Sequence, residues 1–98
     1  MSMTFKEMDR LIDARLNLHT SPVIEFNRLP AILGVAQGSW WSFTNTMRPE
    51  DKPPMFRAGG SECLYAKDGT AADWCKAFVR KHPKRFGIEV PKDGEKSK

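Results

Sequence analysis

The first twenty residues combine apolar and charged side chains with the spacing of a helix. The apolar ones recur every three or four positions: Phe5, Met8, Leu11, Ile12 and Leu16. This spacing places them along one helical face and leaves most charged side chains on the other. Thr4 and Glu7 have capping-box spacing, in which each side chain pairs with a free backbone amide of the other residue. The pattern predicts an amphipathic helix over residues 5–18, ended by His19-Thr20-Ser21-Pro22.

Two short helices around a glycine are predicted next. Residues 23–26 form a short apolar patch, either a strand or an extended segment. Asn27 can cap the helix that follows, with Pro30 tolerated in its first turn. Gly34 ends that helix because glycine accepts a left-handed conformation without steric cost. A second helix is expected over residues 37–46.

The second helix carries two adjacent tryptophans, Trp40 and Trp41. Neighbouring residues point in different directions on a helix, so we expect one indole in the core. The other would form an exposed contact surface for a partner. The core is also expected to contain Leu33, Val35, Trp74 and Phe78.

A β-hairpin is predicted after this helix. Residues 48–54 contain three prolines, too many for a helix or a central strand. Strands are expected at residues 55–57 and 63–65. The Ala58-Gly59-Gly60-Ser61 sequence between them has the composition of a tight hairpin turn.

The last predicted helix covers residues 71–82. Thr70 or Asp68 can cap its start, and Pro83 stops it. Beyond Val90 there is no apolar residue to bury, so this end is predicted to be disordered.

Positive charge is concentrated in the last quarter of the chain. Residues 1–75 hold eight Lys or Arg and nine Asp or Glu, a net charge of −1, whereas residues 76–98 hold eight and three, a net charge of +5. No Asp or Glu occurs between Lys76 and Ile88. Such a block is either a solubilising surface or the electrostatic footprint of a protein that binds a polyanion such as nucleic acid.

The order of the predicted elements is that of a winged helix-turn-helix. At 98 residues the chain is expected to form one domain. We predict a mostly α fold with a small β-hairpin, namely a winged helix-turn-helix preceded by an N-terminal amphipathic helix. Residues 1–22 would be the N-terminal helix and linker, residues 23–88 the winged helix-turn-helix DNA-binding domain, and residues 89–98 a disordered basic tail.

Membrane proteins and enzymes are not expected. No run of about eighteen apolar residues is present, and the N-terminus lacks the order of a signal peptide, so the protein is expected to be cytoplasmic. No catalytic motif or phosphate-binding glycine loop occurs, and neither an enzyme nor a cofactor is expected. Cys63 and Cys75 are expected to be reduced, and no closely spaced ligand pair indicates a metal site.

Several short motifs carry a family resemblance. The run Leu33-Gly34-Val35-Ala36-Gln37-Gly38-Ser39-Trp40-Trp41 is similar to the turn of helix-turn-helix proteins. It is followed, in order, by Pro53-Pro54, Gly59-Gly60, Tyr65 and Ala71-Ala72-Asp73-Trp74. Together, residues 29–78 resemble the small winged-helix DNA-binding domains of phage and prophage excisionases, a family that overlaps with AlpA-type regulators and the MerR-like group. Two departures are the absence of Arg and Lys from residues 37–46 and the additional N-terminal helix.

The resemblance implies double-stranded DNA as partner and no catalysis. An excisionase acts as a recombination directionality factor, which binds and bends attachment-site DNA, cooperates with further copies of itself and helps the phage integrase in excision. It would work in the bacterial cytoplasm, associated with the nucleoid. An AlpA-like transcriptional regulator is the alternative. A second alternative, favoured by the uncharged recognition helix and an exposed tryptophan, is a small phage protein that inhibits or adapts a host protein.

The candidate DNA-binding residues fall into two groups. Polar side chains on the second helix can meet base edges in the major groove: Gln37, Ser39, Ser42 and Asn45. Basic side chains after it, on the hairpin and in the last quarter of the chain can meet phosphates: Arg48, Arg57, Lys76, Arg80, Lys81, Lys84 and Arg85.

Overall fold

The computed structural model describes residues 3–88, and its first element is the predicted amphipathic helix, α1 (Phe5–Leu18). The predicted capping box is present. Thr4 Oγ1 accepts a hydrogen bond from the Glu7 amide at 3.1 Å, and the Glu7 carboxylate accepts one from the Thr4 amide at 2.9 Å. Met8, Ile12 and Leu16 are buried on one face.

The predicted pair of helices around a glycine is also confirmed. A short strand, β1 (Val23–Glu25), leads through a 3₁₀ turn, η1 (Phe26–Arg28), into α2 (Leu29–Leu33). Gly34 ends α2 with a φ of 76°, the left-handed conformation that favours glycine. The second helix, α3 (Gln37–Thr46), has the predicted bounds.

The predicted cap of α2 is wrong. Asn27 lies inside η1 and makes no capping hydrogen bond, and α2 begins two residues later. The 3₁₀ turn runs directly into the helix, and the Leu29 amide donates to the carbonyl of Phe26. A backbone acceptor therefore serves the start of α2 in place of an Asn side chain.

The hairpin is part of a larger sheet than predicted. After a 3₁₀ turn, η2 (Pro49–Asp51), come β2 (Phe56–Ala58) and β3 (Ser61–Tyr65). Gly59 and Gly60 form the turn, with φ values of 59° and 82°. β1 pairs antiparallel with the other edge of β3, which gives a three-stranded sheet in the order β1-β3-β2.

The last helix, α4 (Thr70–Lys81), ends before Pro83 as predicted and is followed by a 3₁₀ turn, η3 (Pro83–Phe86). Its N-cap residue is Gly69, but the Asp68 carboxylate accepts a hydrogen bond from the Thr70 amide at 2.9 Å. That bond lowers the pKa of Asp68. Of the two predicted caps, Asp68 therefore supplies the side-chain acceptor.

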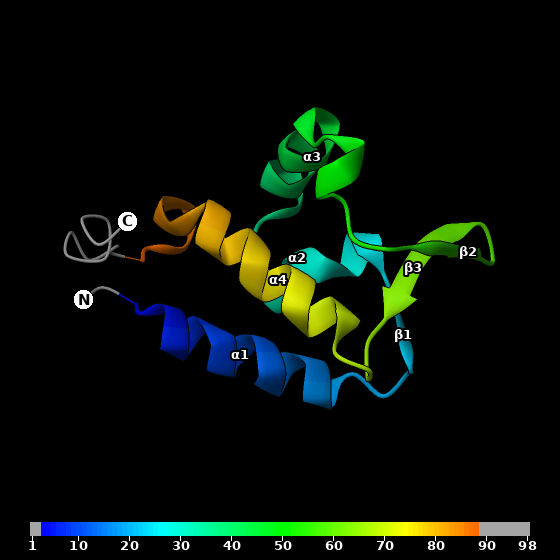
Figure 1. Ribbon diagram of the computed structural model, residues 1–98, viewed down its shortest axis with the longest axis horizontal. Coiled ribbons are helices and arrows are strands. Elements are labelled where there is room, and N and C mark those ends of the chain that lie inside the picture. Colours follow the sequence, from blue (N-terminus) through cyan, green and yellow to red (C-terminus); the bar gives the residue numbers. More distant parts are fainter. Residues whose placement is uncertain (1–2, 89–98) are drawn as a thin grey trace.

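The fold is mostly helical with a small antiparallel sheet. α4 lies between α1 and α3, and the β2–β3 hairpin projects at the opposite end of the molecule from the first turn of α1 (Figure 1). Met3 and Ile88 pair in a parallel bridge. The predicted shared core is confirmed: Leu33 and Phe78 are buried, and Val35 and Trp74 pack against the same cluster.

The predicted tail, residues 89–98, lies outside the described residues. Its sequence holds three Lys and three Asp or Glu, so the description of this segment as basic is wrong. The excess positive charge belongs to residues 76–88, which hold five Lys or Arg and no acid. None of the helices within residues 3–88 is long and apolar enough to cross a membrane.

Candidate nucleic-acid interface

Trp40 decides which face of α3 is exposed. Its side chain is 1% exposed and packs against Phe26, Trp74 and Phe78, with ring centroids 5.0 to 6.1 Å apart. The next residue, Trp41, is 66% exposed. Trp40 is therefore the predicted core indole, and Trp41 is the exposed one.

The outward face of α3 is polar apart from this one indole. Of the four predicted base-contacting residues, Gln37, Ser42 and Asn45 are exposed, and Ser39 is half-buried at the edge of the face. The side chains at positions 37, 41 and 45 are four residues apart, so they follow one line along the helix. Trp41 stands at the centre of that line.

The start of α3 and the hairpin meet at η1. Gln37 Nε2 donates to the backbone carbonyl of Asn27 at 3.3 Å. Asn27 and Arg57 line one polar pocket of about 300 Å³, together with Glu25, Phe26, Gly60, Ser61 and Glu62. Asn27 is therefore contacted by the predicted reading helix and shares a pocket with the predicted wing arginine.

Arg57 is held by the turn of its own hairpin. Its Nη1 donates to the carbonyl of Gly60 at 3.2 Å, while the side chain stays exposed. At the other end of α3, Arg48 forms an exposed ion pair with Glu50 at 3.8 Å. Exposed pairs of this kind are weak, so Arg48 can exchange its carboxylate for a phosphate at little cost.

The basic side chains of α4 have partners that sequence reasoning missed. Lys76 Nζ lies 3.1 Å from Asp13, and Arg80 binds both carboxylate oxygens of Asp9 at 2.9 and 3.0 Å. The same guanidinium lies over the ring of Phe5. Hydrogen bonds from Arg80 lower the pKa of Asp9, against the opposing effect of burial.

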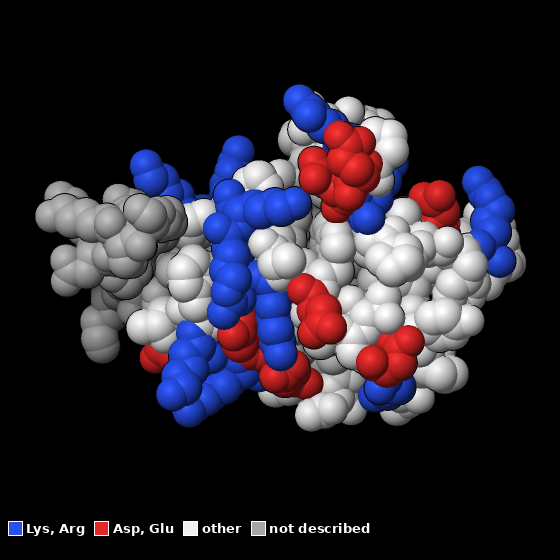
Figure 2. Space-filling model, in the orientation of Figure 1, with Lys and Arg blue, Asp and Glu red and all other residues white. Residues whose placement is uncertain are grey.

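These pairs fasten α1 to α4 and interleave opposite charges on that face of the molecule (Figure 2). No acid is near the cluster along the chain, but Asp9 and Asp13 approach it in space. Their spacing of four residues matches that of Lys76 and Arg80, and this match was the signal available in the sequence.

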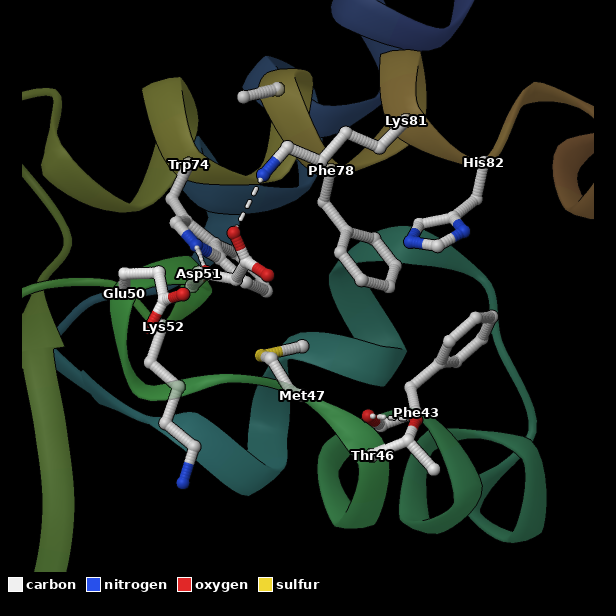
Figure 3. Close-up of a pocket in the computed structure, with 11 residues that line it drawn as sticks. Phe43, Thr46, Met47, Glu50, Asp51, Lys52, Trp74, Phe78, Lys81 and His82 are labelled. Atoms are coloured by element: carbon white, nitrogen blue, oxygen red, sulfur yellow. Dashed lines mark hydrogen bonds and ion pairs between the residues drawn. The ribbon is translucent and has the colours of Figure 1, made fainter.

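Lys81 belongs to a different contact, between α4 and η2. Its Nζ lies 3.3 Å from the Asp51 carboxylate, and Trp74 Nε1 donates to the Asp51 carbonyl at 2.9 Å. Below these bonds lies a pocket of about 280 Å³ between α3, η2 and α4, walled by aromatic side chains (Figure 3). The labelled aromatic residues of its lining are Phe43, Trp74, Phe78 and His82.

His82 packs between α3 and α4. Its ring centroid is 5.2 Å from that of Phe43 and 4.8 Å from that of Phe78. Burial lowers the pKa of His82, and the charges of Arg85 and Lys81 lower it further. At neutral pH the ring is therefore held in its uncharged form.

Among the basic residues from Lys76 to Arg85, the two that lie beyond α4 are the least neutralised. Lys84 and Arg85 are exposed, and within residues 3–88 neither forms an ion pair with a carboxylate. Arg85 lies over the ring of Phe43, 5.1 Å from its centroid, and so beside α3. Arg28, which sequence reasoning missed, is also exposed, and it directly follows Asn27.

No metal or thiol chemistry emerges from the described part of the chain. Within it, no three side chains of His, Cys, Asp or Glu are grouped so as to hold a metal ion. Cys63 and Cys75 are free, buried thiols. Burial raises the pKa of Cys75 to about 12, so the reactive thiolate is suppressed.

Comparison with known proteins gave no family: no family model, curated protein or solved structure matches the chain. A function is therefore inferred from geometry and charge. The relevant features are the uncharged face of α3, the hairpin arginine that shares a pocket with η1, and the cations at the two ends of α3.

Proposed function

We propose that the chain is a double-stranded DNA-binding protein with a winged helix-turn-helix. In this proposal α2 and α3 are the helix-turn-helix, α3 enters the major groove, and the β2–β3 hairpin is the wing. The observation that carries it is the position of Asn27, which accepts a hydrogen bond from Gln37 of α3 and shares a pocket with Arg57 of the hairpin. One duplex lying across η1 would touch the reading helix and the wing together.

The order and joints of the elements support this assignment. The left-handed Gly34 turns the chain between α2 and α3, and β1 pairs with β3 at the base of the hairpin. α1 and α4 pack against each other away from the hairpin turn. They would serve as the support of the DNA-contacting elements.

The side chains suit the roles that the groove requires. Gln37 and Asn45 can pair with adenine, and Ser42 can meet a base or a phosphate. Phosphate contacts would come mainly from exposed cations: Arg28, Arg48, Arg57, Lys84 and Arg85. Lys76, Arg80 and Lys81 would contribute less, because each has a carboxylate partner within 3.3 Å, closer than the 3.8 Å pair of Arg48.

Within DNA-binding proteins, the excisionase role fits the uncharged reading face best. Such a face discriminates modestly between sites, so neighbouring copies binding together and DNA deformability would have to add specificity. A factor that binds repeated sites, bends the DNA and positions an integrase works in this way. The protein would act without catalysis, in the cytoplasm of a bacterial host. An AlpA-like transcriptional regulator would use the same interface.

Salt-dependent binding tests the DNA proposal. The wild type should bind a duplex of about 20 base pairs, with affinity falling steeply between about 50 and 200 mM salt. The variant R57A/R85A should lower the salt slope by up to about two units, one for each lost phosphate contact. K76A/R80A removes the same charge from the α1 side and is the matched control, with a smaller expected change.

Two outcomes would overturn the proposal. The first is a wild type without salt-dependent binding to any duplex. The second is equal slopes for the wild type and both variants. If DNA binding holds, excision assays and promoter fusions run in parallel would separate an excisionase from a transcriptional regulator.

A host-protein adaptor is the second candidate, and the exposure of Trp41 favours it. Large exposed aromatic side chains are common anchors of protein interfaces. Tyr65, on β3, is also 52% exposed. In this case the wild type would show no salt-dependent DNA binding, and W41A would abolish capture of the partner.

A further inference from the structure

We infer that Trp41 makes α3 selective for thymine, by packing its indole against the thymine methyl group in the major groove. This inference rests on the proposed DNA-binding function and names the base class that α3 prefers. The juxtaposition behind it is a lone exposed indole at the centre of an uncharged helix face, with cations beyond both ends of that face.

Within residues 3–88, the indole belongs neither to the core nor to the apolar side chains packed against it. Trp40 already fills the core position of α3, and Trp41 is 66% exposed beside it. Gln37 and Asn45 lie one turn before and one turn after it. Any partner that the two amides contact must therefore meet the indole as well.

The charge around α3 indicates that this partner is a polyanion. No Asp or Glu occurs from Phe26 to Pro49. Arg28 lies in η1, whose Asn27 carbonyl contacts Gln37, and Arg48 follows the end of the helix, where it forms a weak, exposed pair with Glu50. A duplex lying along α3 would therefore meet a cation near each end of the helix. Between the two cations it would meet no carboxylate of residues 26–49.

Gly38 is a second sign of a partner at this face. It lies in the first turn of α3 without a positive φ, and a Cβ added there would meet no atom within 4 Å. Neither backbone conformation nor packing requires glycine, which weakens a helix relative to alanine. Gly38 is three residues before Trp41, so it leaves room beside the indole for close approach.

The groups that each base presents in the major groove then indicate which base the indole would contact. In the major groove, thymine alone among the four DNA bases carries a methyl group, and its O4 is an acceptor. An indole offers an apolar face for the methyl group and an N–H donor for an acceptor. Guanine and adenine offer hydrogen-bonding groups at this edge but no apolar group for the indole to cover.

Duplexes that differ by this methyl group test the inference. The probes are alternating A·T and A·U duplexes of equal length, and alternating G·C duplexes with and without the cytosine 5-methyl group. The wild type should bind each methylated duplex about fourfold more tightly for each methyl group that it contacts. This ratio corresponds to the free energy gained by burying one methyl group. W41A should bind both members of each pair equally, while keeping the salt slope of the wild type.

Leu18→Ala is the matched control, because Leu18 is 81% exposed and lies at the end of α1. It should leave the methyl preference unchanged. Gly38→Ala should weaken binding to every duplex while leaving or raising the thermal midpoint. Equal thermal midpoints of W41A and the wild type will show that W41A is folded.

The outcomes separate the inference from the proposed function. If the wild type binds with a salt slope but shows no methyl preference, or W41A keeps that preference, the inference is wrong and the DNA-binding proposal stands. If W41A binds every duplex as the wild type does, the indole does not contact the DNA and the inference is wrong. If the wild type binds no duplex, both fail.

Discussion

At the scale of single residues, the two adjacent tryptophans differ in environment, because one is buried and the other is exposed. Trp40 is buried among Phe26, Trp74 and Phe78, and its Nε1 has no hydrogen-bond partner among the described residues. A buried donor without an acceptor costs stability, and the packing of the indole outweighs that cost.

Alanine substitutions at the two positions should therefore differ sharply. W40A should lower the free energy of unfolding by about 3–5 kcal/mol, because it empties a core position. W41A should change it by less than about 0.5 kcal/mol, as expected for a surface position. Urea unfolding of both variants measures the difference, and equal losses would contradict the assignment of core and surface.

His82 gives stability a pH dependence. Its pKa in the folded protein is below the ordinary value of 6.5, so the unfolded chain binds the proton more readily. The contribution of uncharged His82 to the free energy of unfolding is complete above about pH 6.5. It declines as the pH falls through the pKa of the folded state. H82F keeps an aromatic ring against Phe43 and Phe78 but cannot titrate. Between about pH 7.5 and pH 5, the urea midpoint of the wild type should therefore fall further than that of H82F.

The two thiols should be inert in the folded protein. Cys75 is fully buried with a pKa raised to about 12, and Cys63 is buried in β3. A thiol-reactive disulfide reagent should modify neither cysteine at neutral pH and both in denaturant. Rapid modification of Cys75 without denaturant would mean that α4 opens from the core.

At the scale of elements, α1 and α4 are joined by apolar contacts and by two ion pairs. Met8, Ile12 and Leu16 supply the buried side of α1, and its carboxylates bind α4 at the rim. The other elements are too short to be stable alone. α2 has five residues and β1 and β2 have three each, so their stability comes from packing.

The Asp9–Arg80 pair should contribute modestly to the joint between α1 and α4. Both side chains are partly exposed, so water screens their attraction, although the contact is bidentate. A double-mutant cycle of D9N and R80Q should give a coupling of roughly 0.2–1 kcal/mol. A coupling near zero would leave the apolar face of α1 and the Asp13–Lys76 pair as the joint.

At the scale of the whole molecule, the proposed interface contains few strong base contacts. Gln37, Ser42 and Asn45 are uncharged, so each contact should lie at the lower end of about 1–3 kcal/mol. Arg57 and the cations near α3 add affinity without much sequence information. Specificity would then depend on several copies bound side by side.

Binding to DNA should accordingly be weak for one site and cooperative for tandem sites. A titration of duplexes that carry one copy or several copies of a selected site measures this. The isotherm should steepen with copy number, because contacts between neighbouring protomers offset the cost of bending. Tight, non-cooperative binding of a monomer to one isolated site would contradict this expectation, and so would N45A or Q37A retaining full preference for that site.

The sequence by itself determined the elements whose cause is local. The apolar spacing and capping box of α1, the glycine that ends α2, and the Gly59-Gly60 turn each depend on residues within a few positions. The exposed polar face of α3 was predictable for the same reason, and most of the candidate base-contacting residues lie there. Adjacent tryptophans required that one be buried, without indicating which.

Only the tertiary structure decided what depends on residues far apart in the chain. It placed β1 against β3, buried Trp40 against Phe26 and α4, and set Gln37 beside Asn27. It also neutralised Lys76 and Arg80, whose partners on α1 are 63 and 71 residues away. The charge along the chain can be read from the sequence, because it is a local property. A phosphate, however, meets only the charge that remains after the ion pairs with α1 have formed, and the packing of α1 on α4 determines these ion pairs.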